Sequence, residues 1–162
     1  MTVDSAIRLA TIDDAPRIAG FSRDWIEYGL RWKWTPARIV NCIRNPATNV
    51  AVAPAMSDGS GVAGFAIMQY KDDEAHLVLL GVDPKHRRKG IAAALMRWHE
   101  ETALTAGIGT VYLEARAGND EARAFYRKLG YREVQHVRGY YENGEGGVRF
   151  AKDLWAAPPQ SA

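Results

Sequence analysis

Residues 81–92 read Gly-Val-Asp-Pro-Lys-His-Arg-Arg-Lys-Gly-Ile-Ala, and this stretch decides how the chain folds. An apolar, strand-like run ends at Val82, a basic turn follows, and an amphipathic helix begins after Gly90. The first backbone N–H groups of a helix have no partner within the helix and attract anions, and the turn adds fixed positive charge. The sequence therefore predicts a strand–turn–helix unit that holds a phosphate group.

Two common phosphate-binding loops are excluded as explanations of this unit. The G-x-x-x-x-G-K-[ST] loop of nucleotide hydrolases is absent, and so is the G-x-G-x-x-G fingerprint of dinucleotide-binding proteins. Residues 87–92 instead fit the pattern [RQ]-x-x-G-x-[GA]. Taken alone, these basic side chains could equally form a solvated turn, because surface charges need no ligand. The pattern by itself leaves both readings open.

Composition indicates an ordinary globular domain. The chain has 162 residues, of which 47% are apolar, enough for one sizeable core. We expect a domain over residues 1–155 and a flexible tail over residues 156–162. Cys42 is the only cysteine, which excludes an intramolecular disulfide and a cysteine-rich zinc site. The four histidines show no paired ligand spacing, so we expect no metal.

Charge and hydropathy narrow the classes of partner. The net charge is only +2 and the isoelectric point about 8.7, which argues against a nucleic-acid-binding protein. No apolar run approaches the roughly 18 residues of a membrane span. Residues 1–5 lack the charged-then-apolar pattern of a secretion signal. We expect a cytoplasmic protein with no membrane and no nucleic-acid partner, and the sequence does not decide between a monomer and a homodimer.

Helical and strand-like periods alternate along the chain without a long linker or repeat. Their order, β-α-α-β-β-β-α-β-α-β-β, predicts one α/β domain with a sheet of mixed direction. Gly107 and Gly130 are expected to end two of the helices. Strands are expected at residues 7–9, 49–53, 62–70, 75–82, 110–115, 131–141 and 148–154. Helices are expected at residues 14–26, 91–107 and 120–128, and a further helix is expected to begin at Pro36.

Several local features are predicted more specifically. Thr35 and Asn119 are expected to cap the helices that follow them. A turn is expected at residues 57–61. Alternation of side chains along the strand at 110–115 places Tyr112, Glu114 and Arg116 on the same face. The apolar stripe of the helix after Gly90 predicts that this helix buries Ile91, Ala94, Leu95 and Trp98. We expect the core or an interface, rather than a substrate cage, to contain Trp25, Trp32 and Trp34.

The basic turn, preceded by Leu-Leu-Gly-Val-Asp-Pro at residues 79–84, resembles the acetyl-CoA-binding motif of the GCN5-related N-acetyltransferases (GNAT). Residues 113–119 (Leu-Glu-Ala-Arg-Ala-Gly-Asn) and 124–131 (Ala-Phe-Tyr-Arg-Lys-Leu-Gly-Tyr) are similar to the other cofactor-side motif of that family. More narrowly, the combination resembles the bacterial ribosomal-protein alanine N-acetyltransferases, which also carry a Tyr-Tyr pair before a turn and a final strand. The resemblance covers residues 62–154, and the first sixty residues do not obviously match.

The resemblance implies a fold and a cosubstrate. The implied fold is a single-domain, mixed but mainly antiparallel sheet of six to seven strands, flanked by about four helices. The implied cosubstrate is acetyl-CoA, with no metal. The backbone of Leu80, Gly81 and Val82 would pair with the pantetheine arm like an added strand. Asn119 would contact the pantetheine region or simply cap its own helix. Backbone amides would cradle the pyrophosphate at Arg87, Arg88, Lys89, Gly90, Ile91 and Ala92.

The resemblance also implies two catalytic residues. An amine must lose a proton before it attacks a thioester, and the departing thiolate leaves more easily if an acid protonates it. By resemblance, Glu114 accepts the proton of the amine and Tyr126 donates one to the thiolate. The plain alternatives are a charge on a half-exposed strand for Glu114 and a core-flanking ring for Tyr126. Tyr140 and Tyr141 could line an acceptor groove or could be ordinary strand aromatics.

The predicted function is transfer of an acetyl group from acetyl-CoA to a primary amine by direct attack in a ternary complex. The first choice of acceptor is the N-terminal α-amine of a protein or peptide. The alternatives are a small-molecule amine, such as a polyamine or an aminoglycoside, and a lysine side chain. A non-catalytic CoA-sensing module would bind acetyl-CoA without turning it over. A nucleic-acid-binding module would show a steep loss of affinity with salt.

Overall fold

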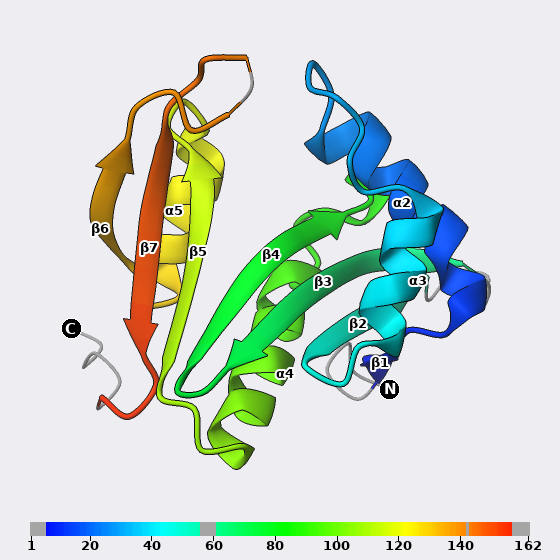
Figure 1. Cartoon of the computed structure of the whole chain (residues 1–162), viewed down its shortest axis with the longest axis horizontal. Coiled ribbons are helices and arrows are strands. Elements are labelled where there is room, and N and C mark those ends of the chain that lie inside the picture. Colours follow the sequence, from blue (N-terminus) through cyan, green and yellow to red (C-terminus); the bar gives the residue numbers. More distant parts are fainter. Residues whose placement is uncertain (1–5, 56–60, 142, 157–162) are drawn as a thin grey trace.

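The computed structural model describes residues 6–55, 61–141 and 143–156. The predicted turn at residues 57–61, apart from Gly61, and the predicted tail, apart from Ala156, lie outside these residues. The described strands form one seven-stranded sheet in the order β1-β2-β3-β4-β5-β7-β6, which confirms the predicted mixed α/β fold and the order of its elements (Figure 1).

The elements follow the predicted ranges closely. The strands are β1 (Arg8–Leu9), β2 (Thr48–Pro54), β3 (Val62–Lys71), β4 (Glu74–Val82), β5 (Thr110–Arg116), β6 (Arg132–Val137) and β7 (Gly147–Asp153). The α-helices are α2 (Ala15–Phe21), α3 (Pro36–Arg44), α4 (Ile91–Thr105) and α5 (Asp120–Lys128). Short helical turns η1 (Ile12–Asp14), η2 (Ser22–Ile26) and η3 (Pro84–His86) complete the described helices.

The pairing of β4 with β5 divides the sheet. It is parallel, whereas the other described strand pairs are antiparallel. The β4–β5 ladder runs only from Glu74↔Thr110 to Leu77↔Leu113, and the two strands then diverge (Figure 1). A register shift at Ile67/Met68 in the neighbouring β3–β4 pair accompanies the divergence, as expected of a bulge that bends its strand. The sheet therefore opens between β4 and β5.

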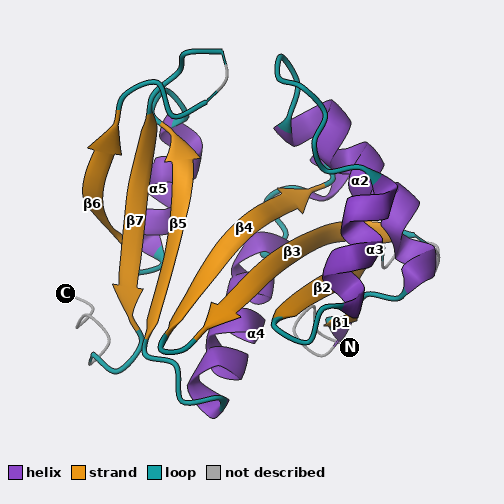
Figure 2. Cartoon of the chain, in the orientation of Figure 1, coloured by secondary structure: helices purple, strands orange, loops and turns teal. Residues whose placement is uncertain are grey.

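Two cores lie on opposite faces of the sheet because strand side chains alternate. Ala51 and Ala53 pack in the core beneath α4 and α5, whereas Val50 and Val52 pack in the core beneath α2 and α3 (Figure 2). On β2, the side chains toward α4 are thus small alanines, and those toward α2 and α3 are larger valines. The helices thus form two layers around the sheet.

Two predicted helix caps are confirmed. The Thr35 hydroxyl accepts a hydrogen bond from the Arg38 amide at 3.4 Å, and the Asn119 side chain accepts one from the Ala122 amide at 3.0 Å. Pro36 follows Thr35 at the first helical position, where its missing N–H costs nothing. These caps fix where α3 and α5 begin.

Two predicted ranges are corrected. The strand predicted at residues 131–141 ends at Val137, because Gly139 turns the chain with a φ of +60°. The helix predicted through Ile26 stops being α-helical at Phe21 and continues as the π-helical turn η2. A buried hydrogen bond of 2.6 Å from the Ser22 hydroxyl to the Glu27 carboxylate spans this wider turn.

The buried face of α4 differs from the prediction at one position. Ile91, Ala94 and Leu95 are buried as predicted, but Trp98 is only half-buried and its neighbour His99 is fully buried. The His99 Nε2–H donates to the Ala66 carbonyl at 2.9 Å. Burial lowers the pKa of His99 to about 4, because a charged imidazole is poorly solvated there.

This buried imidazole predicts a loss of stability in mild acid. An unfolded imidazole takes up a proton below its pKa of about 6.5, whereas folded His99 does so only near its pKa of about 4. The unfolded state therefore binds more protons between these values, and the free energy of unfolding falls as pH drops, by about 2 kcal/mol at pH 5. Urea unfolding of His99→Gln, which keeps a donor for Ala66, should show a correspondingly weaker loss between pH 7 and 5.

The matched control is His136→Gln, because the His136 side chain is 66% exposed. This variant should keep the pH dependence of the wild-type protein. An unchanged pH dependence in His99→Gln would contradict the assignment to His99.

Candidate functional site

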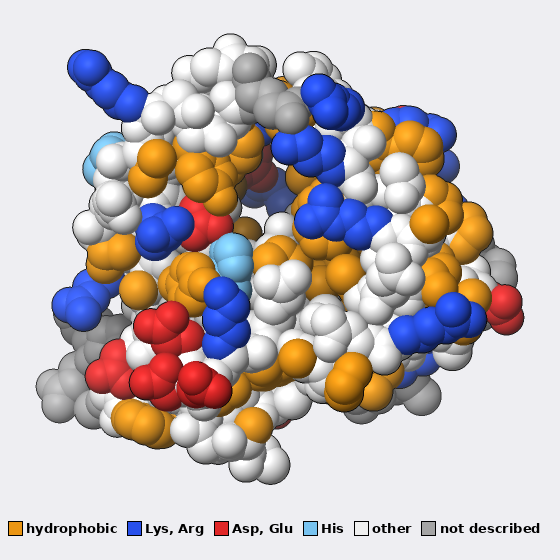
Figure 3. Space-filling model, in the orientation of Figure 1, with side chains coloured by type: hydrophobic (Ala, Val, Ile, Leu, Met, Phe, Trp, Pro, Cys, Tyr) orange, Lys and Arg blue, Asp and Glu red, His pale blue; other side chains and the backbone are white. Residues whose placement is uncertain are grey.

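A cleft of about 890 Å³ lies where β4 and β5 diverge. Figure 3 shows a hollow near the middle of this face, with Lys and Arg side chains gathered along one side. The lining comes from both layers around the sheet. Asn119, Ala122 and Tyr126 of the α5 layer line it, and so do Tyr28 and Trp34 of the N-terminal segment on the other face. The cleft is therefore accessible to groups from both faces of the sheet.

One wall of the cleft is an unpaired strand edge. Leu80, Gly81 and Val82 line the cleft, as the sequence predicts for a cofactor site. They follow Leu77, the last residue of β4 in the ladder with β5. Backbone groups on an unpaired edge can bind an extended ligand in the manner of an added strand. The predicted mode of pantetheine binding fits this wall.

The turn before α4 has the geometry of an anion-binding site. Gly90 stands at the N-cap of α4 with a φ of +77°, and Arg88 has a φ of +64°, the only positive φ of a non-glycine among the described residues. The first N–H groups of α4 have no intrahelical partner. Arg87 lines the cleft, whereas Lys89 is exposed outside its lining. The turn therefore presents backbone donors and positive charge beside the cleft.

Not every predicted cofactor residue can bind through its side chain. The Ile91 side chain is buried in the core, so only its backbone is available to a ligand. Ala92 and Gly90 likewise offer backbone groups. Asn119 both caps α5 and lines the cleft, so the two alternatives for this residue are compatible. Of the six residues predicted to cradle the pyrophosphate, Arg87 lines the cleft, and the lining does not include Arg88, Lys89, Gly90, Ile91 or Ala92. The placement of a CoA thioester along these residues stays a prediction.

Glu114 is the centre of a hydrogen-bonded cluster. It lines the cleft with a side chain that is only 7% exposed. Its Oε1 lies 2.7 Å from His76 Nε2 and accepts a hydrogen bond from the Tyr140 hydroxyl at 3.2 Å. Its Oε2 accepts one from Arg149 Nε at 2.9 Å. Burial works to raise the pKa of Glu114, but the bonds and charges of His76 and Arg149 outweigh it and lower that pKa.

Tyr126 reaches the cleft from the opposite face. Its residue is 8% exposed, its ring packs at 5.8 Å from that of Phe150, and it lines the cleft. None of the described residues forms a hydrogen bond with its hydroxyl group. Burial raises the pKa of Tyr126, with a smaller contribution from Tyr141, so the phenol stays protonated at neutral pH. A buried ring with an unengaged hydroxyl at a cleft can act as a hydrogen-bond or proton donor.

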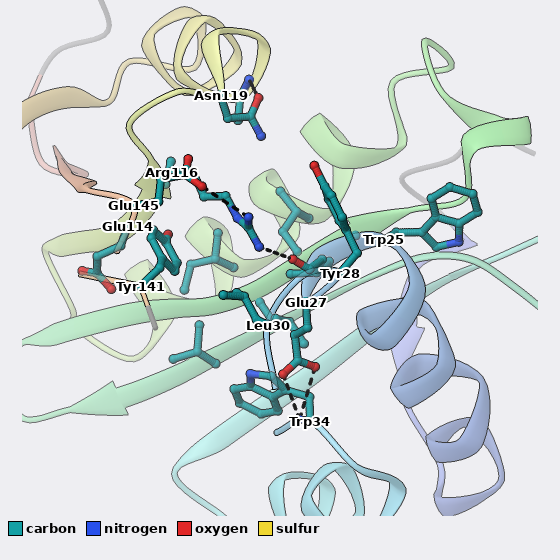
Figure 4. A pocket seen from close by; sticks show the side chains of 18 of the residues that line it. Trp25, Glu27, Tyr28, Leu30, Trp34, Glu114, Arg116, Asn119, Tyr141 and Glu145 are labelled. Atoms are coloured by element: carbon teal, nitrogen blue, oxygen red, sulfur yellow. Dashed lines mark hydrogen bonds and ion pairs between the residues drawn. The ribbon is translucent and has the colours of Figure 1, made fainter. Parts of the chain in front are cut away.

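The segment of residues 25–34 forms the opposite wall. The Glu27 side chain is buried and accepts hydrogen bonds from the Lys33 amide at 2.7 Å and from the Trp34 amide, which shapes the loop (Figure 4). Trp34 packs against the core and also lines the cleft. Trp25 is 51% exposed and lines the cleft, so the prediction that it lies in the core is wrong, whereas its place in an interface stays a prediction.

Arg116 ties this wall to the rest of the site. Its guanidinium donates to the Ile26 carbonyl at 2.9 Å and pairs with Glu145 at 3.4 Å. The Tyr28 and Tyr141 rings lie on either side of it, each with a centroid 5.4 Å away (Figure 4). One cation thus joins β5, the N-terminal wall and the loop before β7. Tyr140 and Tyr141, which the sequence left undecided, both line the cleft.

Sequence reasoning missed His76, Arg149, Arg116 and Glu27. The parallel pairing of β4 with β5 brings His76 beside Tyr112, and the antiparallel pairing of β5 with β7 brings Arg149 opposite Glu114. Knowing which residues pair across these strands would have identified both residues. Among the described residues, no group of three or more His, Cys, Asp or Glu side chains could hold a metal ion. Within the same residues no helix is long and apolar enough to cross a membrane.

Comparison with known proteins identifies relatives of similar sequence. The [ribosomal protein bS18]-alanine N-acetyltransferase of Escherichia coli is 36% identical over 91 residues, 56% of this chain and 62% of the relative. The N-alpha-acetyltransferase of Mycobacterium tuberculosis is 33% identical over 109 residues, 67% of each chain. The matched stretch thus spans less than two thirds of the length of the E. coli relative.

Solved structures extend the likeness over nearly the whole chain. Ard1 from Thermoplasma volcanium has a TM-score of 0.78 and 25% identity, covering 93% of this chain and 97% of that one. The E. coli ribosomal-protein-S18-alanine N-acetyltransferase has a TM-score of 0.75 and 27% identity, covering 96% and 97%.

The family match itself begins well before the region expected from the sequence. Residues 8–131 match the model of the Acetyltransferase (GNAT) family, so the first sixty residues, which showed no obvious resemblance, are largely included. The matched region contains the cleft-lining residues from Trp25 to Tyr126, whereas Tyr140, Tyr141 and Glu145 lie beyond it. The chain belongs to the GNAT acetyltransferase family.

Proposed function

We propose that the protein transfers an acetyl group from acetyl-CoA to the N-terminal α-amine of a protein or peptide. The observation that carries the proposal is a cleft that cuts between β4 and β5 and is lined from both faces of the sheet. The α4–α5 face supplies the backbone donors and the basic turn for the cosubstrate. The other face supplies the aromatic and charged wall for the amine. Two substrates can therefore meet without an acyl-enzyme intermediate.

The residues in the cleft divide the chemistry between the two faces. The amine enters beside Glu114 and releases its proton to the cluster around that carboxylate. The amine nitrogen then attacks the thioester carbon, a C–N bond forms and the C–S bond breaks. Tyr126 donates its proton to the departing sulfur. Because the pKa of Tyr126 is raised, its phenolate must regain a proton in the same step. The substrate nitrogen supplies this proton, since it holds two after the attack and the amide product keeps one.

An α-amine is favoured over the other acceptors for two reasons. Both relatives described above act, by name, on an alanine or an α-amine, and each is at least 33% identical to this chain over the matched stretch. The acceptor wall is also compact, because Arg116 joins Tyr28 and Tyr141 across it. A slender extended chain end suits such an opening. A ribosomal protein as acceptor would require the cytoplasmic location predicted from the sequence.

The decisive experiment measures CoA release and locates the acetyl group by mass spectrometry. The acceptors are peptides with free alanine and methionine N-termini, the same peptides with a blocked N-terminus and an internal lysine, a polyamine and an aminoglycoside. Turnover with the free N-termini alone supports the proposal. Turnover only with lysine or the small amines would replace the acceptor. Binding of acetyl-CoA without turnover across the panel would indicate a CoA-sensing module.

The bridging role of Arg116 predicts a selective effect on the acceptor. Arg116→Ala should raise the KM for the acceptor peptide about tenfold and leave the affinity for acetyl-CoA unchanged, because the residue contacts the acceptor wall and not the α4 turn. Steady-state kinetics with each substrate varied in turn measures both values.

The control is Arg123→Ala, which loses an arginine with the same kinds of contact. Arg123 donates to the Ala117 carbonyl at 2.7 Å and pairs with Glu133, away from the cleft lining. Similar effects of the two variants on the acceptor KM would contradict the role of Arg116.

A further inference from the structure

We propose that His76, a residue of β4, is the group that takes the proton of the acceptor amine, and that Glu114 orients His76. The inference rests on the proposed function and assigns one of its steps to a stated atom. It starts from a contact of 2.7 Å between His76 Nε2 and Glu114 Oε1, inside the cleft lining.

The carboxylate decides which ring nitrogen of His76 is free. An ionised carboxylate only accepts hydrogen bonds, so the nitrogen that contacts Glu114 carries the proton. Nε2–H therefore donates to Oε1, and Nδ1 keeps its lone pair. None of the described residues forms a hydrogen bond with Nδ1. A histidine held by a carboxylate, with its second nitrogen open to the substrate, is the arrangement of a general base.

Accessibility also favours the imidazole over the carboxylate. Three donors occupy Glu114, namely His76, Tyr140 and Arg149. The Glu114 side chain is 7% exposed, whereas that of His76 is 22% exposed. An ionised carboxylate has about four lone-pair sites, so these three donors leave an approaching amine little of the carboxylate to bind. It meets the His76 ring without displacing a protein hydrogen bond.

The position of His76 in the sheet matches the acceptor side. Its neighbours Ala75 and Leu77 point into the core beneath α4 and α5, so the His76 side chain projects from the opposite face. Glu114 projects from that same face of β5, because Leu113 and Ala115 are buried on the other. The amine is proposed to enter from this face. Tyr126 approaches from the face of α5, so acid and base stand on opposite sides of the reacting atoms.

The surroundings hold the ring in place. The His76 ring stacks on the Tyr112 ring, with centroids 4.3 Å apart and planes 8° apart. Besides Glu114, the titratable and charged groups that face this cluster are Tyr112, Tyr140, Tyr141 and Arg149. The Arg149 guanidinium lies 5.8 Å from the Tyr112 ring and binds Glu114 from the side opposite His76. The cluster fixes both the tautomer and the direction of the imidazole.

The basicity of an imidazole, compared with that of a carboxylate, also favours His76 as the proton acceptor. A free α-amine has a pKa of about 8, an imidazole about 6.5 and a glutamate about 4.3. Transfer of a proton from the amine to an imidazole is therefore about 100-fold more favourable than transfer to a glutamate. The hydrogen bonds and charges of His76 and Arg149 lower the pKa of Glu114, which keeps the orienting group ionised.

The step balances as follows. The ammonium form of the acceptor gives one proton to His76 Nδ1 and becomes a neutral amine. Its nitrogen forms a bond with the acetyl carbon, and the C–S bond breaks. The thiolate takes the proton of Tyr126, which is replaced by the second proton of the nitrogen. The imidazolium of His76 returns its proton to water, so that the net products are an acetylated amine, free CoA and one proton.

The test compares His76→Gln, Glu114→Gln and the double variant, with acetyl transfer by the wild-type protein as the prior check of the proposed function. We expect His76→Gln to lower kcat about 100-fold at an unchanged KM for acetyl-CoA, and the double variant to be no slower than the slower single variant. The deficit of His76→Gln should narrow from pH 7 to 9.5, as more amine becomes neutral in solution. His76→Asn serves as a second variant, and His136→Gln is the control with an exposed histidine.

Two outcomes would overturn the assignment. The first is a kcat of His76→Gln within about threefold of wild type while Glu114→Gln is strongly impaired, which would make Glu114 the base. The second is a deficit that does not change with pH, which indicates a merely structural role. If the wild-type protein acetylates no amine, the proposed function fails instead.

A spectroscopic readout does not depend on turnover. In the ¹⁵N-histidine NMR spectrum of the wild-type protein, His76 should carry its proton on Nε2, and Glu114→Gln should weaken that preference. A proton on Nδ1 in the wild-type protein would leave no lone pair for the amine and would refute the proposal.

Discussion

Tyr126→Phe is expected to lower kcat by on the order of 100-fold or more, while the affinity for acetyl-CoA stays within about twofold of wild type. The variant removes one hydroxyl, which forms no hydrogen bond with the described residues, from a residue that lines the cleft. The ring keeps its packing against Phe150 and Tyr131, so the free energy of unfolding should change little. Steady-state kinetics and equilibrium binding of acetyl-CoA separate the two effects.

The pH dependence adds a sharper criterion. A CoA thiol resembles a cysteine thiol, whose pKa is about 8.5, so the departing thiolate needs an acid less as the solution becomes alkaline. The deficit of Tyr126→Phe should therefore shrink above that pH.

Tyr131→Phe is the matched control for this variant. Tyr131 belongs to the same aromatic cluster, with its ring centroid 6.0 Å from that of Tyr126, and it is also buried. Its hydroxyl donates to Glu100 at 2.8 Å and does not line the cleft. Tyr131→Phe should lose some stability and keep its kcat. Equal kcat values for the Tyr126→Phe and wild-type proteins would remove Tyr126 from the mechanism.

Gly90→Val is expected to weaken acetyl-CoA binding by on the order of 10- to 100-fold. Gly90 has a φ of +77°, a conformation that costs a β-branched residue about 1–3 kcal/mol. No atom lies within 4 Å of an added Cβ, so strain rather than a clash causes the effect. The chain would relieve the strain by moving the turn, which would displace the backbone donors at the start of α4. Isothermal titration with acetyl-CoA measures the loss.

Gly107→Val provides the control at the other end of α4. Gly107 has a φ of +82° and, like Gly90, no atom within 4 Å of an added Cβ. The substitution introduces the same strain far from the basic turn, so it should lower stability and leave acetyl-CoA affinity unchanged. S-acetylpantetheine, which has no pyrophosphate, should bind equally to Gly90→Val and wild type. An equal loss of acetyl-CoA affinity in both glycine variants would contradict a phosphate cradle at Gly90.

Much of the fold follows from local patterns. Strand alternation placed Glu114 opposite the buried Leu113 and Ala115, and side-chain caps at Thr35 and Asn119 placed two helix starts. These signals are readable because they depend on residues a few positions apart. The basic turn before α4 can be recognised for the same reason, since its charged residues and its glycine are contiguous.

The acceptor side was less predictable because it depends on contacts between distant residues. The hydrogen bond between His76 and Glu114 joins residues 38 positions apart, and that between Arg116 and Ile26 joins residues 90 apart. Both require the register of β4 and β5 and the path of the N-terminal segment. The exposed position of Trp25 was missed for a related reason, because a helical period does not reveal that the helix widens into a π-turn after Phe21.

The early end of the β4–β5 ladder fixes the length of the unpaired β4 edge along the cleft. Five residues, Val78–Val82, extend beyond the last paired residue, Leu77. At about 3.3 Å per residue, this edge spans roughly 16 Å between the basic turn and the cluster around Glu114. In the proposed binding mode, a thioester anchored at α4 presents its carbonyl to Glu114 and Tyr126 only if its arm is about that long. In that mode, the strand edge would select acetyl donors by the length of their arm, independently of the chemistry of the acyl group.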